Sequence, residues 1–148
     1  MDVYFIRHGQ TEYNKKHLHQ SADIPLTELG KRKALLLTDI VVTLNPTHVL
    51  SSPYTRTRET AEIACKELPL DIEFNTLFVE LIRSDAMIGR HHFSFVSIVY
   101  LLSWFFSGDE FYSDAKRGES RLAFLKRIHD AKRYLETLPK DARVVECS

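Results

Sequence analysis

The stretch VYFIRHGQTEYN, residues 3–14, decides how the rest of the chain is interpreted. Val3–Ile6 alternates too little between polar and apolar residues for an exposed strand, which predicts a strand buried on both faces. This strand ends abruptly in Arg7, His8 and Gly9 instead of in ordinary turn residues. A guanidinium and an imidazole side by side at the end of a buried strand indicate a site that binds an anion.

The composition excludes several classes of partner. The chain has 148 residues, enough for one domain over residues 1–148 whose core needs neither disulfides nor metal. Its 20 Lys and Arg residues balance its 20 Asp and Glu residues, so no bulk charge draws it to nucleic acid or to an anionic membrane. We therefore expect no nucleic-acid partner and no membrane partner, and any anion site must be local.

The cysteines, the N-terminus and the apolar segments indicate the cellular compartment of the protein. Cys65 and Cys147 are too few for a disulfide framework and are interpreted as reduced thiols. The N-terminus lacks the basic region and the cleavage site of a signal peptide. The apolar stretch Phe93–Phe106 is shorter than the ~20 residues of a spanning helix and is interrupted by serines. We expect a cytoplasmic protein in which this stretch is a buried or lid helix. An interfacial or oligomer-forming helix, as in a homodimer, is the alternative.

The order of the predicted elements indicates an α/β fold. Strands are expected at Val3–Ile6, His48–Leu50, Asp71–Phe74 and Arg143–Val145. Helices are expected over Thr27–Leu44, from Ser52–Pro53 to Leu68, and from Glu119–Ser120 to Leu138, each with its apolar residues facing inward. This alternation predicts a largely parallel central sheet with helices on both faces. Ligands bind at the carboxyl ends of such strands, where His8 and the Ser51–Ser52 turn would both lie.

The residues at the end of the first strand suit phosphate chemistry. Arg7 supplies a rigid fork of donors for a phosphate, and the neutral imidazole of His8 can attack phosphorus to give a phosphohistidine. Gly9 leaves room for the anion near the backbone, while Thr11 and Asn14 add hydroxyl and amide groups. A bare Arg–His pair would be interpreted as a surface pair, but these neighbours after a buried strand favour a phosphate site.

Here the stretch FIRHGQTEYN resembles the signature of the histidine phosphatase superfamily, the phosphoglycerate mutase-like proteins. Further segments resemble the family's pattern in its order: DIPLTELG (Asp23–Gly30), LSSPYTRTRETAEIA (Leu50–Ala64) and GES (Gly118–Ser120). The resemblance extends from Val3 to Ser148 and is weaker in the middle. It implies the family's α/β fold and a phosphoryl-transfer chemistry that needs no metal and no other cofactor.

Carried over residue by residue, the resemblance makes His8 the nucleophile that becomes phosphorylated. Arg7 and Arg56 match phosphate-binding arginines, and Asn14 matches an asparagine that lines the pocket. Arg56 would lie in the first turn of a helix, where backbone amides favour an anion. Arg58 is not at the matching position and is interpreted as a surface or supporting residue.

The family's general acid is a Glu or Asp, and the segment LFVELIRSDAMIG (Leu77–Gly89) fits its position loosely. Glu80 is the candidate acid–base residue, a role typically worth ~10²–10⁴-fold in rate. A carboxylate between apolar residues is also often a partnered structural group. Asp85 is the reserve candidate.

The resemblance also implies a second histidine, in a Ser/Thr-His-Gly motif directly after the last strand. The chain reads DARVVECS and stops at Ser148, which aligns with the residue before that histidine. Either the C-terminal part of a longer protein is missing, which the position of the stop favours, or a short member works weakly or only binds. His91 and His92 are considered as substitutes and interpreted as surface residues, since no predicted rigid element fixes them.

The expected partner is a small phosphorylated substrate. Phosphoglycerate mutases typically carry Trp where this chain has Tyr13, together with long lid insertions, so a phosphatase that hydrolyses a phosphomonoester is favoured. Mutase-type transfer and a catalytically impaired phospho-ligand binding module are the alternatives. Candidates to face the substrate are Phe95, Tyr100, Trp104 and Phe105, with Arg83 and Arg90 at the entrance, although core packing and solvated arginines explain them equally well. His17 and His19 lack the third ligand of a metal site.

Overall fold

The computed structural model describes residues 1–106 and 118–148, and it contains the predicted parallel sheet. The strands are β1 (Asp2–Ile6), β2 (His48–Ser51), β3 (Ile72–Phe74) and β4 (Arg143–Cys147). They lie in the order β1-β4-β2-β3, and each neighbouring pair is parallel. The α/β fold with a parallel central sheet is therefore confirmed.

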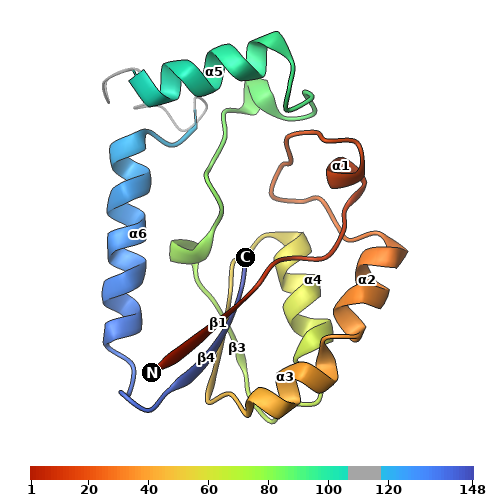
Figure 1. Cartoon of the computed structure of the whole chain (residues 1–148), viewed down its shortest axis with the longest axis vertical. Coiled ribbons are helices and arrows are strands. Elements are labelled where there is room, and N and C mark those ends of the chain that lie inside the picture. The colour runs from red at the N-terminus through yellow and green to blue at the C-terminus, as the bar shows by residue number, and fades with distance from the viewer. Residues whose placement is uncertain (107–117) are drawn as a thin grey trace.

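Helices cover both faces of the sheet (Figure 1). The helices on one side are α2 (Glu28–Leu35), α3 (Thr38–Leu44) and α4 (Thr55–Ala64), and α6 (Arg121–Glu136) lies on the other. The short α1 (Glu12–Lys15) and the longer α5 (Phe95–Phe106) lie beyond the carboxyl ends of the strands, and single 3₁₀ turns occupy Thr76–Phe78 and Asp85–Met87.

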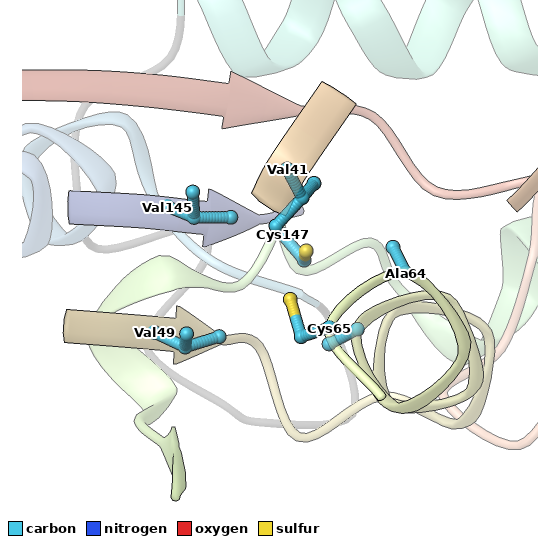
Figure 2. Packing of buried hydrophobic residues seen from close by; sticks show 7 residues of the cluster. Val41, Val49, Ala64, Cys65, Val145 and Cys147 are labelled. Atoms are coloured by element: carbon cyan, nitrogen blue, oxygen red, sulfur yellow. The ribbon is translucent and has the colours of Figure 1, made fainter. Parts of the chain in front are cut away.

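Alternating residues of β4 supply both halves of the core. Val145 and Cys147 point to the side of α3 and α4, where they pack with Val49 and Cys65 (Figure 2). Val144 points to the α6 side and packs in a second cluster with Leu50, Phe78 and Ala142. Burying a valine contributes about 1.5–3 kcal/mol, so the fully buried β4 valines make this strand the centre of the fold. Cys65 and Cys147 are free thiols.

β1, the strand that leads into Arg7 and His8, lies at an edge of the described sheet, and the prediction that it is buried on both faces is wrong. Among the described strands β1 pairs only with β4, and Phe5 leaves 69% of its surface exposed. The apolar run of β1 suggested burial on both faces, but pairing partners are decided by segments far along the chain. The interior strands of the described sheet are β4 and β2.

Two of the three predicted helix starts are confirmed. The Thr27 side chain caps α2 by accepting from the Gly30 N–H, and Ser120 caps α6 by accepting from the Ala123 N–H. The start at Ser52–Pro53 is wrong, since α4 begins at Thr55. Ser52 instead continues the strand, because its N–H donates to the Cys147 carbonyl at 3.0 Å.

The single helix predicted over Thr27–Leu44 is two helices, α2 and α3, and its leucines do not all face inward. Leu36 is 75% exposed and Ile40 is 55% exposed. The buried face of α2 is formed by small residues instead, Gly30 and Ala34. A Cβ on Gly9 would lie 2.8 Å from the Gly30 carbonyl oxygen, so both glycines are needed for the loop after β1 to approach α2 this closely.

The apolar stretch does form a helix, α5, but most of its apolar side chains are not buried. Ser97 is the buried residue of this helix, while Phe95 is 81% and Phe106 79% exposed. Likewise Leu122, Leu125 and Ile128 of α6 remain about half exposed, and Leu135 packs against the core. Within residues 1–106 and 118–148, no helix combines the length and apolar character that crossing a membrane requires.

Candidate active site

The carboxyl ends of three strands meet at the site, as expected for a parallel sheet. The His8 N–H donates to the Ser148 carbonyl at 2.8 Å, which places the end of β1 beside the end of β4. The Gly9 N–H donates to the Thr60 hydroxyl at 3.0 Å, and that hydroxyl donates to the Arg56 carbonyl at 2.7 Å. The loop that follows β1 is thereby fixed against α4, the helix that carries Arg56.

His8 is held as a neutral imidazole with one available lone pair. Its Nδ1 lies 2.7 Å from the Gly9 carbonyl oxygen, which can only accept, so Nδ1 carries the proton and Nε2 the lone pair. Burial lowers the pKa of His8, and the Arg56 and Arg7 charges lower it further, against the opposing effects of the Gly9 carbonyl and Glu80. A neutral ring oriented in this way is a competent nucleophile at Nε2.

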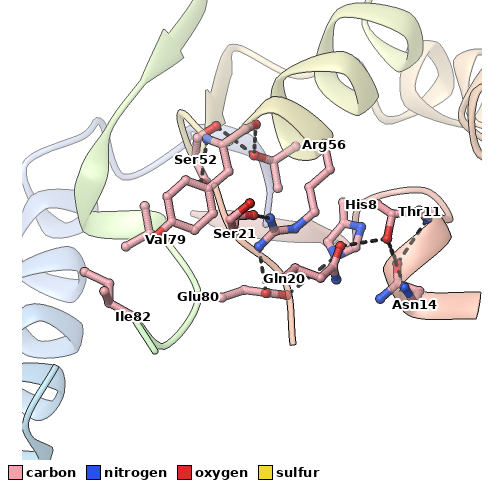
Figure 3. A network of polar contacts seen from close by, with 12 residues as sticks. His8, Thr11, Asn14, Gln20, Ser21, Ser52, Arg56, Val79, Glu80 and Ile82 are labelled. Carbon is pink, nitrogen blue, oxygen red and sulfur yellow. Dashed lines mark hydrogen bonds and ion pairs between the residues drawn. The ribbon is translucent and has the colours of Figure 1, made fainter. Parts of the chain in front are cut away.

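Arg56 is the most enclosed charge of the site. It is 2% exposed and lies in the first turn of α4, as predicted. Its Nη1 donates to the Ser21 carbonyl at 2.9 Å, and its Nη2 lies 3.0 Å from Glu80 Oε2 (Figure 3). Arg58, by contrast, is exposed and lies over the Phe74 ring, so its interpretation as a surface residue is confirmed.

Glu80 reaches His8 as well as Arg56. Its Oε1 lies 3.7 Å from His8 Nε2, so one carboxylate spans His8 and Arg56. Both groups face the same carboxylate in Figure 3. Glu80 is therefore brought to the site that the resemblance implies for it, with its side chain 43% exposed.

Arg127 anchors the segment that carries Glu80, and sequence reasoning missed it. Its guanidinium donates to the carbonyls of Val79 at 2.6 Å, Leu77 at 3.2 Å and Glu80 at 3.4 Å. The same group pairs with both carboxylate oxygens of Glu119, at 2.6 and 2.8 Å. Because the bonds from Arg127 to the three carbonyls join residues 47 or more positions apart, no local pattern in the sequence could have revealed them.

Thr11 and Asn14 form a hydrogen-bonded corner at the start of α1, and Asn14 lines both cavities described below. The Thr11 hydroxyl accepts from the Asn14 backbone N–H at 3.0 Å, while the Asn14 Oδ1 lies 3.2 Å from the Thr11 N–H, so the two residues cap α1 reciprocally. Thr11 is fully buried, and its hydroxyl also donates to Gln20 Oε1 at 2.7 Å (Figure 3). These bonds fix the Asn14 amide at the site.

Two cavities open beside His8. The first, of about 340 Å³, is lined by Asn14 and by side chains of both charges: Arg7, Arg56, Glu80, Arg83 and Asp85. The second, of about 570 Å³, is lined by His8 itself and by Arg7, Lys33 and Thr60 among others, and no carboxylate of residues 1–106 or 118–148 lines it. Both cavities can take an anion near His8, since basic side chains face each of them.

Other predicted contacts lie away from these cavities. Arg83 lines the first cavity, whereas the Arg90 guanidinium donates to the Ala86 carbonyl at 2.8 Å. Of the aromatic candidates, none lines either cavity; the Tyr100 hydroxyl lies 3.3 Å from the Ser84 N–H, and the Trp104 indole donates to the Glu119 carbonyl at 2.8 Å. The structure thus does not bring the aromatic side chains of α5 to the site.

Metal ligation has no support among residues 1–106 and 118–148, where no three His, Cys, Asp or Glu side chains are grouped to hold an ion. His17 and His19 instead pack against His91 and His92, respectively.

Comparison with known proteins assigns the chain to a family. A family model described as the histidine phosphatase superfamily (branch 1) matches residues 3–148. The probable phosphoglycerate mutase GpmB of Citrobacter koseri is 38% identical over 82 residues, which are 55% of this chain and 38% of that protein. The match therefore spans less than half the length of this curated relative.

Solved structures share the fold over nearly the whole chain. The α-ribazole phosphatase of Shigella flexneri superposes with a TM-score of 0.80 at 23% identity, covering 100% of this chain and 73% of that one. The phosphoglycerate mutase of Bacillus anthracis superposes with a TM-score of 0.75 at 23% identity, covering 98% of this chain and 73% of that one. At these identities the likeness shows the fold alone.

Proposed function

Because the chain belongs to the histidine phosphatase superfamily (branch 1), we propose that it is a phosphatase that hydrolyses a phosphomonoester through a phosphohistidine on His8. The observation that carries the proposal is the His8 geometry. Nδ1 is committed to the Gly9 carbonyl, and Nε2 faces the Arg56–Glu80 pair at the carboxyl ends of the strands.

In the first step, His8 Nε2 attacks the phosphorus of the ester. The N–P bond forms while the bond from phosphorus to the ester oxygen breaks, and the departing oxygen takes a proton from Glu80, which in this step is protonated and released from its ion pair with Arg56. Arg7, Arg56 and Asn14 bind the phosphoryl oxygens, on which the charge is spread during transfer. Arg56, which is 2% exposed, strengthens this binding because little water competes with it.

In the second step, a water molecule attacks the phosphohistidine. The Glu80 carboxylate takes a proton from this water, the N–P bond breaks, and His8 returns to its neutral state with inorganic phosphate as product. Glu80 suits both steps because it reaches His8 Nε2 at 3.7 Å and is 43% exposed, so a leaving alcohol and an incoming water have access to it. Asp85, the other carboxylate of the first cavity, is the reserve for this role.

A mutase is the second candidate, favoured by the C. koseri relative named as a probable phosphoglycerate mutase. The first step is the same, and the phosphoryl group then passes to a second hydroxyl instead of to water. The second cavity, which no carboxylate of the described residues lines, gives such an acceptor with its own negative charge a place next to His8.

Trapping the intermediate tests the proposal. The protein is mixed with p-nitrophenyl phosphate, quenched in base, and analysed by mass spectrometry for a phosphoryl group on His8. Phosphate release should disappear in His8→Ala, with the circular dichroism spectrum unchanged. Turnover that survives in His8→Ala would remove His8 from the reaction, whereas a phosphohistidine whose phosphoryl group passes to phosphoglycerate in preference to water would favour the mutase.

A further inference from the structure

His92 lies at the junction of the two cavities beside His8. It lines both of them, and it shares that position with Arg7 and Asn14, the two side chains assigned to the phosphate. From this position we propose that His92 is a further substrate-binding residue, whose ring N–H contacts an oxygen of the phosphorylated substrate. This inference rests on the proposed function and adds a binding group to the same site.

His92 is exposed, as expected for a surface residue, but its backbone is held in place, which sequence reasoning did not predict. The His92 N–H donates to the His17 carbonyl at 2.9 Å, and the His19 N–H donates to the Arg90 carbonyl at 2.9 Å. Between these bonds, Leu18 and His91 form an antiparallel β-bridge. The segment that follows α1 is therefore bound to the segment that carries His92 by backbone hydrogen bonds.

The side chain of His92 is supported as well. Its ring packs on the His19 ring, with the centroids 4.4 Å apart. His19 is 6% exposed, and its Nε2 lies 3.1 Å from the Ser97 hydroxyl. That hydroxyl donates to the His91 carbonyl at 2.9 Å. A buried, hydrogen-bonded ring below His92 limits the directions that its imidazole can take.

The chemistry of the position suits an anion. Burial lowers the pKa of His92, and the charges of Arg83, His91 and His17 lower it further against the opposing effect of the Leu18 carbonyl. A phosphoryl group bound within a few ångströms favours the protonated ring, in which both nitrogens donate. His92 thereby adds a donor to the cavity that Arg56 also lines.

The neighbouring histidine provides a matched control. His91 lines neither cavity, and its Nδ1 accepts from the Phe93 N–H at 3.2 Å. Its ring packs against the rings of His17 and Phe93. A substitution at His91 therefore changes the same local segment without changing the two cavities.

Binding of orthovanadate, a phosphate analogue, measured by titration calorimetry, tests the proposal. His92→Phe keeps a ring on His19 but removes the N–H groups, so the dissociation constant should rise roughly 10-fold or more, the effect of losing one hydrogen bond to a charged group. KM for p-nitrophenyl phosphate should rise in parallel. His91→Phe should leave both values unchanged, and His92→Gln, which retains a donor, should recover part of the affinity.

Vanadate affinity that is equal in His92→Phe and in the parent protein would overturn the proposal, and so would an equal loss in His91→Phe. These results are independent of the phosphohistidine test. If the parent protein forms no phosphohistidine, the proposed function falls, while the vanadate comparison still decides whether His92 touches the anion.

Discussion

Glu80 and Arg56 form an ion pair of 3.0 Å between a carboxylate that is 43% exposed and a guanidinium that is 2% exposed. The Arg56 guanidinium is held in place, because its Nη1 also donates to the Ser21 carbonyl. The partly exposed Glu80 side chain can move away from the arginine. Glu80 thus occupies Arg56 Nη2, and a phosphoryl group that binds at this nitrogen would displace the carboxylate from it.

Replacing Arg56 by Ala should weaken vanadate binding by about 1.5–3 kcal/mol, the range for a hydrogen bond to a charged group. The physical reason is the loss of an enclosed cation at the phosphate, with Glu80 left unpaired beside it. Calorimetric titration measures the change, and the exposed Arg58→Ala on the same helix is the control. Equal affinities for the parent and Arg56→Ala would remove this residue from the site.

Replacing Glu80 by Gln should separate acid catalysis from binding. For an alkyl phosphomonoester, whose leaving group needs a proton, kcat should fall by ~10²–10⁴-fold, the usual size of general acid–base effects. For p-nitrophenyl phosphate, with its good leaving group, the first step should change little. Asp85→Asn, at the other carboxylate of the first cavity, is the control. If Asp85→Asn shows the leaving-group dependence and Glu80→Gln does not, the two roles are exchanged.

The pH dependence of kcat/KM should report His8. Its pKa lies below the ordinary 6.5 because of burial and the arginine charges, and the neutral ring is the reactive form. Activity should therefore rise with pH and reach half of its plateau below pH 6.5, since protonation of His8 removes the nucleophile only under more acidic conditions. A pH–rate profile with p-nitrophenyl phosphate measures this midpoint. A midpoint above pH 7 would contradict the proposed state of His8.

Arg127 should act as a positioning residue for Glu80. Arg127→Gln breaks the bonds to the Leu77, Val79 and Glu80 carbonyls, so kcat should fall most for the alkyl phosphomonoester, as in Glu80→Gln. Because both changes act through one carboxylate, their effects on kcat should not add in the double variant. Arg133→Gln, at an exposed arginine of α6 that pairs with Asp130, is the control. Additive losses would show that Arg127 acts separately from Glu80.

Glu146 should make stability depend on pH. It is 1% exposed on β4, and burial raises its pKa from 4.5 to about 7. The folded state then binds a proton more tightly than the unfolded state, so the free energy of unfolding falls as pH rises from 4.5 to 7, on the order of 3 kcal/mol in total.

Glu146→Gln removes the charge without changing the shape, so its stability advantage over the parent should be small at pH 5 and largest at pH 8. Urea unfolding at pH 5 and pH 8 measures this difference in the free energy of unfolding, with Glu136→Gln on the surface of α6 as the control. A stability advantage of Glu146→Gln that is equal at both pH values would show that Glu146 does not titrate between them.

Local signals explain the parts of the fold that were predicted correctly. The strands at β1, β2 and β4 follow from short apolar runs, and the caps Thr27 and Ser120 follow from the preference of hydroxyl side chains for orphan amides. The placement of His8 follows in the same way, since parallel strands bring their carboxyl ends to one edge. These properties depend on neighbours in the sequence, and a single sequence contains that information.

The tertiary structure decided what depends on contacts between distant segments. It put β1 at the edge of the described sheet, divided the helix predicted over Thr27–Leu44, and left the apolar residues of α5 exposed. It also supplied Arg127 and His92, which acquire their positions only when α6 meets the segment that carries Glu80 and the segment after α1 meets residues 90–92. Sequence by itself determined which residue is the proposed nucleophile, because Arg7, His8 and Gly9 lie within one short motif. What surrounds His8 was decided only by folding, because Arg56, Glu80 and His92 each come from a different part of the chain.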